Sequence, residues 1–257
     1  EMPKYTGYLK PRNFEIFRDT LEASGMLDQA EDLVRASGKL QALLYKEEIE
    51  SALRTPGMGG FQILQLHDFP GQGTALVGVL DPFWEEKGYV SPEEFRRFCN
   101  RTVPLVRLER RVLTTDEVLG ADVEVSHFGP EPLRDVTPRW RLVGDDGQDV
   151  AAGSLPPRTL PVDNGTALGH IRVELREVPA PARYRLVVGL ESTPFENEWE
   201  VWVYPEALDD RVPMGVSLAS ALDETTLARL REGGRVLLQV APNRVRGDES
   251  RPVALGF

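Results

Sequence analysis

The chain has 257 residues, of which 41% are apolar, and its 30 Lys and Arg against 41 Asp and Glu give a net charge of −11. This composition is typical of a soluble globular protein, and the negative charge argues against nucleic acid as a partner. No apolar run reaches the roughly 18 residues of a membrane span, and the first residues do not resemble a signal peptide. The compartment stays open between the cytoplasm and secretion with a leader outside this chain.

Apolar residues at helical spacing dominate the first hundred residues. We expect helices from Pro11 to about Gly25, from Leu27 to Ala36 and from about Leu40 to Arg54. The last of these ends at Thr55-Pro56-Gly57, a strong stop. A further helix is expected over Ser91–Asn100, because its start has a cap residue, a first-turn proline and early acids.

The apolar run Phe61–Leu66 ends abruptly on polar residues and a glycine-rich loop. Such a run predicts a strand buried on both faces of a parallel sheet. Ligands bind at the carboxyl ends of parallel strands in barrels and doubly wound sheets. Four polar residues at the end of this run and in the loop after it are therefore the candidate substrate-binding residues: Gln65, His67, Asp68 and Gln72.

From about Pro104 the apolar period becomes two, and turn signals recur, which indicates an antiparallel β-sandwich. Asp145-Asp146-Gly147 is a predicted hairpin turn. The expected strands are Ala121–Ser126, Arg139–Val143, Leu168–Leu175, Arg183–Leu190 and Trp199–Tyr204. Three tryptophans are interpreted as core and edge aromatics of the sandwich, with a sugar-stacking platform as the alternative: Trp140, Trp199 and Trp202.

The last fifty residues, 206–257, predict a helix over Asp223–Arg231 and a strand over Arg235–Val240, the start of another α/β unit. Neither end of the chain supplies enough elements to close a core. We therefore expect either a piece of a longer protein or self-association that completes the layers.

The sequence contains few motifs that could carry chemistry. The glycines of Gly71-Gln72-Gly73 do not have dinucleotide-binding spacing, and no zinc spacing links His67, His127 and His170, so neither a cofactor nor a metal is expected. Cys99 is interpreted as a buried structural thiol. A serine hydrolase that uses Ser217 with His67 and Asp68 is a weak alternative, because the surrounding residues lack a nucleophile elbow.

Three glutamates, Glu47, Glu48 and Glu50, could in principle supply the paired carboxylates of a glycosidase. They lie in the middle of a predicted helix beside Lys46 and Arg54, where charged residues four positions apart pair on the helix surface. We therefore interpret them as a solvated charged face.

The helix before Thr55-Pro56-Gly57 and the segment Gly59–Phe69 together resemble the end of the catalytic barrel of glycoside hydrolase family 2, which includes β-galactosidases and β-glucuronidases. In that family a Gly-Gly-Phe strand, the eighth of the barrel, ends beside the sugar pocket. Phe128–Leu133 and Trp140–Val143 resemble the immunoglobulin-like domain that follows the barrel. The resemblance covers roughly residues 11 to 205.

The resemblance implies a multi-domain α/β plus all-β protein. Residues 1–103 would be the C-terminal part of a (β/α)8 barrel, residues 104–205 an immunoglobulin-like sandwich, and residues 206–257 a short α/β segment. It also implies a parent enzyme that hydrolyses β-glycosides with retention. Neither family catalytic glutamate matches a residue of this chain, so the catalytic residues are unknown. A non-catalytic carbohydrate-binding or assembly module is the alternative.

Overall fold

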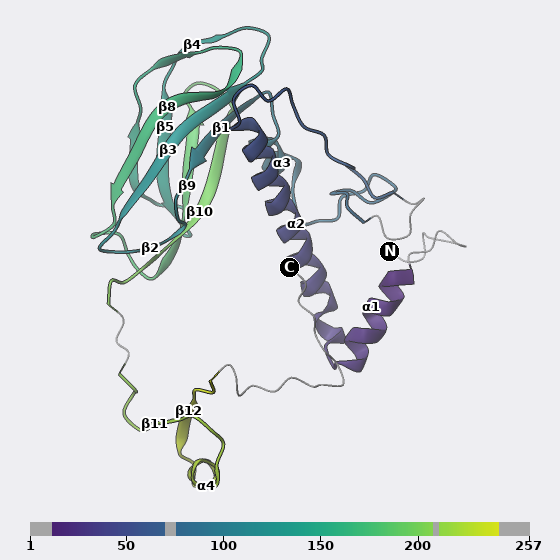
Figure 1. Ribbon diagram of the computed structural model, residues 1–257, viewed down its shortest axis with the longest axis vertical. Coiled ribbons are helices and arrows are strands. Elements are labelled where there is room, and N and C mark those ends of the chain that lie inside the picture. Colours follow the sequence, from purple (N-terminus) through teal and green to yellow (C-terminus); the bar gives the residue numbers. More distant parts are fainter. Residues whose placement is uncertain (1–11, 70–75, 208–210, 242–257) are drawn as a thin grey trace. The chain divides into compact units, whose positions relative to one another are not determined.

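The computed structural model describes residues 12–69, 76–207 and 211–241. The chain divides after Glu206 into two compact units, which are treated separately below (Figure 1). The larger unit contains the helices of the first hundred residues together with a β-sandwich. None of the helices in the described residues is both long and apolar enough to span a lipid bilayer.

The helical part consists of α1 (Arg12–Ala23), the short 3-10 helix η3 (Leu27–Gln29), α2 (Ala30–Leu53) and α3 (Pro92–Phe98). Helix α3 begins as its sequence predicts. The Ser91 side chain accepts from the Glu94 amide, and the Glu94 carboxylate accepts from the Ser91 amide, which is a complete capping box.

Helix α2 is one continuous helix where the sequence predicts two, because Gly38 does not interrupt it. Gly38 is buried, and a Cβ atom at this position would lie 2.2 Å from the ring of Tyr89. The glycine therefore admits an aromatic ring to the helix surface. Its role is close packing, not the termination of a helix.

The β-sandwich consists of a three-stranded sheet in the order β1-β3-β8 and a five-stranded sheet in the order β2-β10-β9-β5-β6. Neighbouring strands are antiparallel except β2 and β10, and β4 pairs separately with β7. The strands are β1 (Thr102–Arg107), β2 (Val112–Thr114), β3 (Val118–His127), β4 (Leu133–Val136), β5 (Pro138–Gly144), β6 (Asp149–Ser154), β7 (Arg158–Leu160), β8 (Asp163–Glu174), β9 (Ala182–Leu190) and β10 (Glu196–Tyr204).

The predicted sandwich is confirmed, since each of its five expected strands overlaps one of the longer strands β3, β5, β8, β9 and β10. Strand β10 alternates between half-buried and buried residues up to its last residue, Tyr204, which is exposed, as expected when one face of a sheet packs on the core. The Asp145-Asp146-Gly147 turn is also confirmed, because the Gly147 amide donates to the Gly144 carbonyl oxygen at 2.9 Å.

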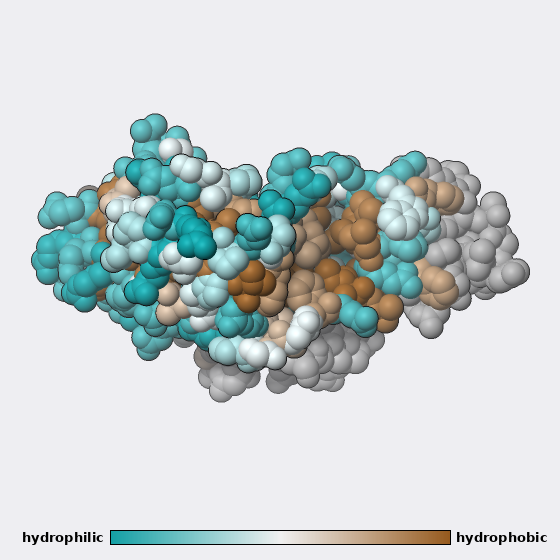
Figure 2. Space-filling view, turned by 90° about the horizontal axis from the view of Figure 1, so that it is seen from above, coloured by the Kyte–Doolittle hydropathy of each residue, from teal (hydrophilic) through white to brown (hydrophobic). Residues whose placement is uncertain are grey.

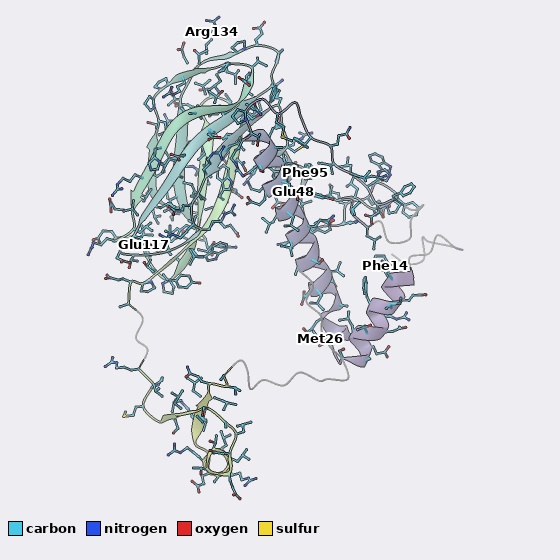
Figure 3. The ribbon with its side chains drawn as sticks, in the orientation of Figure 1. Phe14, Met26, Glu48, Phe95, Glu117 and Arg134 are labelled. Atoms are coloured by element: carbon cyan, nitrogen blue, oxygen red, sulfur yellow. The ribbon has the colours of Figure 1, made fainter. Side chains whose placement is uncertain are left out.

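A second apolar cluster joins the helices to the sandwich. It contains Ile49 and Leu53 of α2, Phe98 of α3, and Val103 and Leu105 of β1, all of them buried. Figure 3 shows Phe95 of α3 close to α2, and Phe95 packs against the same cluster. The helical part and the sandwich therefore share a core.

The predicted strand at Phe61–Leu66 is wrong. The segment is irregular, and Leu64 is 81% exposed. In the described part of the chain, an isolated parallel bridge between His67 and Leu80 follows directly after this segment. An apolar run becomes a strand only when another strand satisfies its backbone, and residues 12–69 and 76–101 contain no other strand. The described residues therefore do not confirm the partial barrel that the resemblance implies.

The smaller unit contains β11 (Val216–Ala219), α4 (Glu224–Arg231) and β12 (Arg235–Leu238). Strands β11 and β12 pair in parallel, with α4 as the crossover between them. Asp223 caps α4 by accepting from the Thr226 amide at 2.8 Å. The predicted helix and strand are both present, and together with β11 they form one βαβ unit.

Candidate functional site

The structure places three of the four predicted substrate-binding residues in one loop. Residues 61–69 and 76–90, here called the platform loop, pack against α2; Gln72 lies outside the described residues. Within the loop, the Asp68 amide donates to the Leu80 carbonyl oxygen at 3.0 Å, and the Leu80 amide donates to the Leu66 carbonyl oxygen at 3.1 Å. These two bonds hold the first half of the loop against the second.

Asp68 is a structural residue of the loop, since only 3% of it is exposed. Its Oδ1 accepts from Lys87 Nζ at 2.7 Å and from the Gly78 amide at 3.0 Å. Lys87 Nζ also donates to the Gly78 carbonyl oxygen at 2.8 Å. A buried carboxylate needs such partners to offset its lost hydration. The expectation that Asp68 contacts a ligand is therefore not supported by its surroundings.

Two α2 residues one turn apart attach the loop to the helix. The Gln41 side-chain amide donates to the Val77 carbonyl oxygen at 2.5 Å, and the Tyr45 hydroxyl donates to the same oxygen. The Tyr89 hydroxyl lies 2.9 Å from Gln41 Oε1 and 2.9 Å from the Gly78 carbonyl oxygen. The Tyr89 ring covers Gly38, so the loop is fixed to α2 by both polar and apolar contacts.

Burial raises the pKa of Tyr89 to about 12, and the nearby charge of Asp68 acts in the same direction. Because the pKa is about 10 in the unfolded chain, the folded state holds this proton more tightly. The neutral hydroxyl therefore stabilises the loop below pH 10, and this stabilisation is lost as the pH rises through 12.

We expect the platform loop to detach from α2 between about pH 10 and pH 12. Urea unfolding at pH 8, 10, 11 and 12, followed by fluorescence, measures this loss. Tyr89→Phe is the control, because it keeps the ring against Gly38 but has no proton to lose. An equally steep alkaline loss in both proteins would contradict the assignment to Tyr89.

A half-buried His67 and an exposed Trp84 lie together in the loop. Their rings stack with centroids 4.6 Å apart and an angle of 22° between planes, and Trp84 is 62% exposed. The turn that carries Trp84 is held by Asp81, whose Oδ1 accepts from the Phe83 amide at 2.8 Å and the Glu85 amide at 2.9 Å. Trp84 itself has a φ of 68°, an uncommon value for a bulky residue. The fold therefore holds a large apolar ring toward solvent.

Trp84 was not singled out in the sequence analysis, although a signal for it exists. Asp81-Pro82-Phe83-Trp84 combines two turn formers with two adjacent aromatic residues. Such a sequence exposes aromatics at a turn. Gln65, the remaining predicted residue, is half-buried, and its Oε1 is buried without a hydrogen-bond partner among the described residues.

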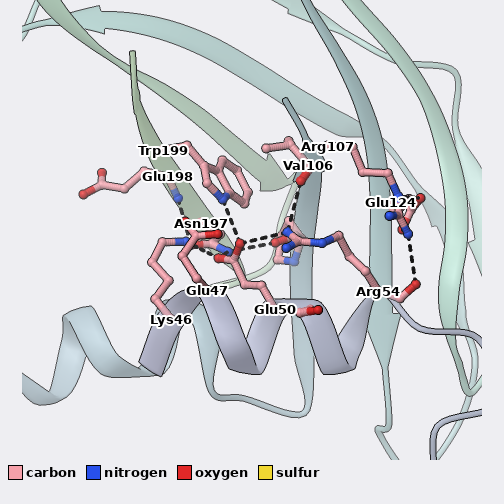
Figure 4. A network of polar contacts seen from close by, with 12 residues as sticks. Lys46, Glu47, Glu50, Arg54, Val106, Arg107, Glu124, Asn197, Glu198 and Trp199 are labelled. Carbon is pink, nitrogen blue, oxygen red and sulfur yellow. Dashed lines mark hydrogen bonds and ion pairs between the residues drawn. The ribbon is translucent and has the colours of Figure 1, made fainter. Parts of the chain in front are cut away.

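The interpretation of Glu50 as part of a solvated face is wrong, because Glu50 is 0% exposed. Figure 4 shows its carboxylate at the centre of a polar network between α2 and β10. It accepts from Asn197 Nδ2 at 2.8 Å, from Trp199 Nε1 at 2.8 Å, from Arg54 at 3.1 Å and from Lys46. All four donors point at one carboxylate, so this group is fully engaged in structure and not placed for acid/base chemistry. Glu48, in contrast, is exposed as expected.

The other chemistry-bearing residues have structural partners. His127 Nδ1 is 2.7 Å from the Thr102 hydroxyl oxygen, and His170 Nδ1 is 2.8 Å from Asp122 Oδ1. The described residues contain no group of three metal-ligating side chains. Cys99, expected to be buried, is half-buried; its thiol packs against the second apolar cluster, and desolvation there raises its pKa.

Trp140 and Trp199 take part in the packing of the sandwich, as interpreted from sequence, whereas Trp202 is half-buried and is not part of the main core. Trp199 is buried, and Trp140 packs against the main core while its ring covers Gly153. Ser217 belongs to the smaller unit, and the side chain that bonds its hydroxyl in the described residues is Arg229, a cation that does not act as a general base. This contact gives the serine-hydrolase alternative no support.

Comparisons with known proteins identify little. A family model described as a domain of unknown function, DUF8488, matches residues 117–205, most of the sandwich. No curated protein matches the chain.

Three solved structures illustrate the similarities. The CARDB domain of a Pyrococcus furiosus protein has 11% identity and a TM-score of 0.32, over 41% of this chain and 94% of that one. A β-glucuronidase of Parabacteroides merdae has 16% identity and a TM-score of 0.29, over 40% of this chain and 14% of that one. The sporulation control protein of Bacillus subtilis has 11% identity and a TM-score of 0.30, over 42% and 51%. At these values none of the three identifies a family or an activity for this chain.

Proposed function

We propose that this chain is part of a retaining β-glycoside hydrolase, and that the stacked pair His67 and Trp84 forms one wall of its sugar pocket. The observation that supports this most is the exposed ring of Trp84. It stacks on His67 in a loop that the buried Asp68 carboxylate fixes through its bond with Lys87. Sugar rings present flat apolar C–H faces, and ligand sites combine apolar walls with a few fixed polar groups. The segment that resembles the barrel end of glycoside hydrolase family 2 carries His67 itself.

The exposed apolar side chains of the first two helices also support a larger assembly. Figure 2 shows apolar patches on the face that is seen from above. On α1 and the first two thirds of α2 the exposed apolar residues are Phe14, Ile16, Phe17, Leu33, Val34, Leu40, Leu43 and Leu44. A large exposed apolar area on a protein surface usually marks an interface. In this proposal the rest of a barrel covers it, either from the remainder of a parent chain or from a second copy.

The catalytic part of the proposal is tested by expressing the chain alone and together with its upstream coding sequence. Both proteins are assayed with aryl β-glycosides. We expect hydrolysis only from the extended protein, because neither family glutamate matches a residue here. Sugar binding without hydrolysis by the extended protein would instead favour the carbohydrate-binding alternative.

Replacing Trp84 is the direct test of the pocket wall. We expect Trp84→Ala to weaken the binding of methyl β-glycosides by about tenfold, measured by calorimetry on the longest protein that binds them. Trp84→Phe should retain most of the affinity, because it keeps a flat ring. Trp202→Phe, in the sandwich, is the matched control. Unchanged affinity in Trp84→Ala would remove this residue from the site.

A further inference from the structure

Helix α2 carries two sets of polar contacts on adjacent parts of its surface. Gln41 and Tyr45 bond the platform loop. Lys46, Glu50 and Arg54, which are spaced four residues apart, bond residues of the sandwich. Residues four apart lie on the same side of a helix. The helix therefore contacts the platform loop with one row of side chains and the β-sandwich with the adjacent row.

On the sandwich side, Asn197 uses its whole amide. Its Nδ2 donates to Glu50 at 2.8 Å and to the Pro104 carbonyl oxygen at 3.0 Å. Its Oδ1 accepts from Lys46 Nζ at 3.0 Å and from the Glu198 amide at 2.9 Å. Asn197 is 0% exposed, so water does not replace these partners. One side chain thus fixes β10, β1 and α2 relative to one another.

Trp199 and Arg54 add further bonds across the same junction. Lys46 Nζ lies 4.6 Å from the centre of the Trp199 ring, and the ring nitrogen donates to Glu50. Arg54 donates to the Val106 carbonyl oxygen at 3.1 Å, and its own carbonyl oxygen accepts from Arg107 at 3.0 Å. The last three turns of α2 are consequently locked to two strands of the sandwich.

Tyr45 connects α2 directly to the platform loop. Tyr45 immediately precedes Lys46, and it bonds the Val77 carbonyl oxygen of the platform loop. Val77 is followed by Gly78, which contacts Asp68, Lys87 and Tyr89. His67 and Trp84 are held by this framework. A shift in the position of α2 relative to the sandwich would therefore also move the stacked rings of His67 and Trp84, through this series of contacts.

We infer that Asn197 and Trp199 are positioning residues for the candidate sugar site, acting through Glu50, Lys46 and α2. The sandwich is then an integral support of the pocket wall and not a separable accessory domain. What the platform binds rests on the proposed function, whereas the mechanical coupling does not.

The coupling is measured on the whole chain labelled with 5-fluorotryptophan, whose four ¹⁹F lines are assigned by single Trp→Phe variants. The Trp84 line reports its stacking on His67. We expect Asn197→Ala to shift or broaden the Trp84 line, although residue 197 lies in the sandwich. Glu200→Ala is the matched control, since among the described residues the side chain of this glutamate of the same strand bonds Arg183 and not α2. The control should leave the Trp84 line unchanged.

The same variants are then titrated with methyl β-glycosides. We expect Asn197→Ala to weaken binding by about three- to thirtyfold without a contact to the sugar. If the wild-type protein binds no sugar, the proposed function fails, while the response of the Trp84 line still decides the coupling. A well-folded Asn197→Ala protein with an unchanged Trp84 line would overturn the inference.

A second measurement covers the case in which Asn197→Ala does not fold. In the wild-type chain, urea should abolish the native Trp84 and Trp199 lines over the same concentration range, because the loop and the sandwich are coupled through α2. Loss of the Trp84 line well before the Trp199 line would show that the loop unfolds independently, and it would overturn the inference as well.

Discussion

Replacing Glu50 with alanine is expected to lower the free energy of unfolding of the larger unit by about 3–5 kcal/mol, the usual cost of removing one partner from a buried ion pair. The substitution leaves the Lys46 ammonium, the Asn197 amide and the Trp199 ring nitrogen without the acceptor that they share. Burial already lowers the pKa of Lys46, and the charge of Glu50 opposes that effect. Without Glu50, the buried cation loses its main compensation.

Urea unfolding monitored by tryptophan fluorescence measures this loss. Glu48→Ala is the matched control, because this neighbouring glutamate is exposed and its removal should change stability by at most about 0.5 kcal/mol. Glu50→Gln should be intermediate, since one oxygen still accepts while the new amide faces two donors. A loss below about 1 kcal/mol in Glu50→Ala would mean that the network of Figure 4 does not hold the helix to the sandwich.

Glu50 also shows what sequence alone could not reveal. Lys46, Glu50 and Arg54 have the spacing of exposed helical ion pairs, and local sequence contains nothing that distinguishes a buried set from an exposed one. The difference comes from Asn197, 147 residues further along the chain. A long-range partner decides the burial of a charge, so a reading of the helix in isolation gives the wrong answer.

The sandwich was predictable because its signals are local. The alternation of buried residues in β10 and the Asp145-Asp146-Gly147 turn can each be recognised from a short run of consecutive residues. Strand β6 was missed because its sequence, Asp149–Ser154, is rich in small residues and has little apolar alternation. The short strands β4 and β7 have too few residues for a period to be recognised.

The sequence pointed to the segment that holds the candidate site, but not to the surroundings of its residues in the structure. Its segment stands out in the sequence as an apolar run that ends on His67 and Asp68. In the structure these two neighbouring residues have different surroundings. Asp68 accepts from Lys87 inside the loop, whereas His67 stacks on Trp84. Asp68 faces inward because Gly78 and Lys87 lie close to it in the fold. No periodic pattern in the sequence predicts that these residues come together.

Gly78→Ala is expected to open the platform loop. A Cβ atom at this buried position would lie 2.3 Å from the His67 carbonyl carbon and 2.5 Å from the Asp68 nitrogen. Both are backbone atoms, so no side chain can rotate to make room, and the two halves of the loop must move apart. Overpacking of this kind costs about 1–3 kcal/mol. The movement would also lengthen the bonds from Gly78 and Lys87 to Asp68, which hold the framework under the stacked rings.

This expectation is checked by the ¹⁹F line of Trp84 and by thermal unfolding. Gly59→Ala is the matched control, because a Cβ there meets no atom within 4 Å and the change should be neutral or slightly stabilising. Gly78→Ala should shift the Trp84 line while the Trp140 line, from the sandwich core, stays in place. If the Trp84 line and the melting temperature both match the wild type, the close approach of residue 78 to His67 is wrong. The rings would then owe their position to some other contact, because Gly78 is the point where Asp68, Lys87 and Tyr89 converge.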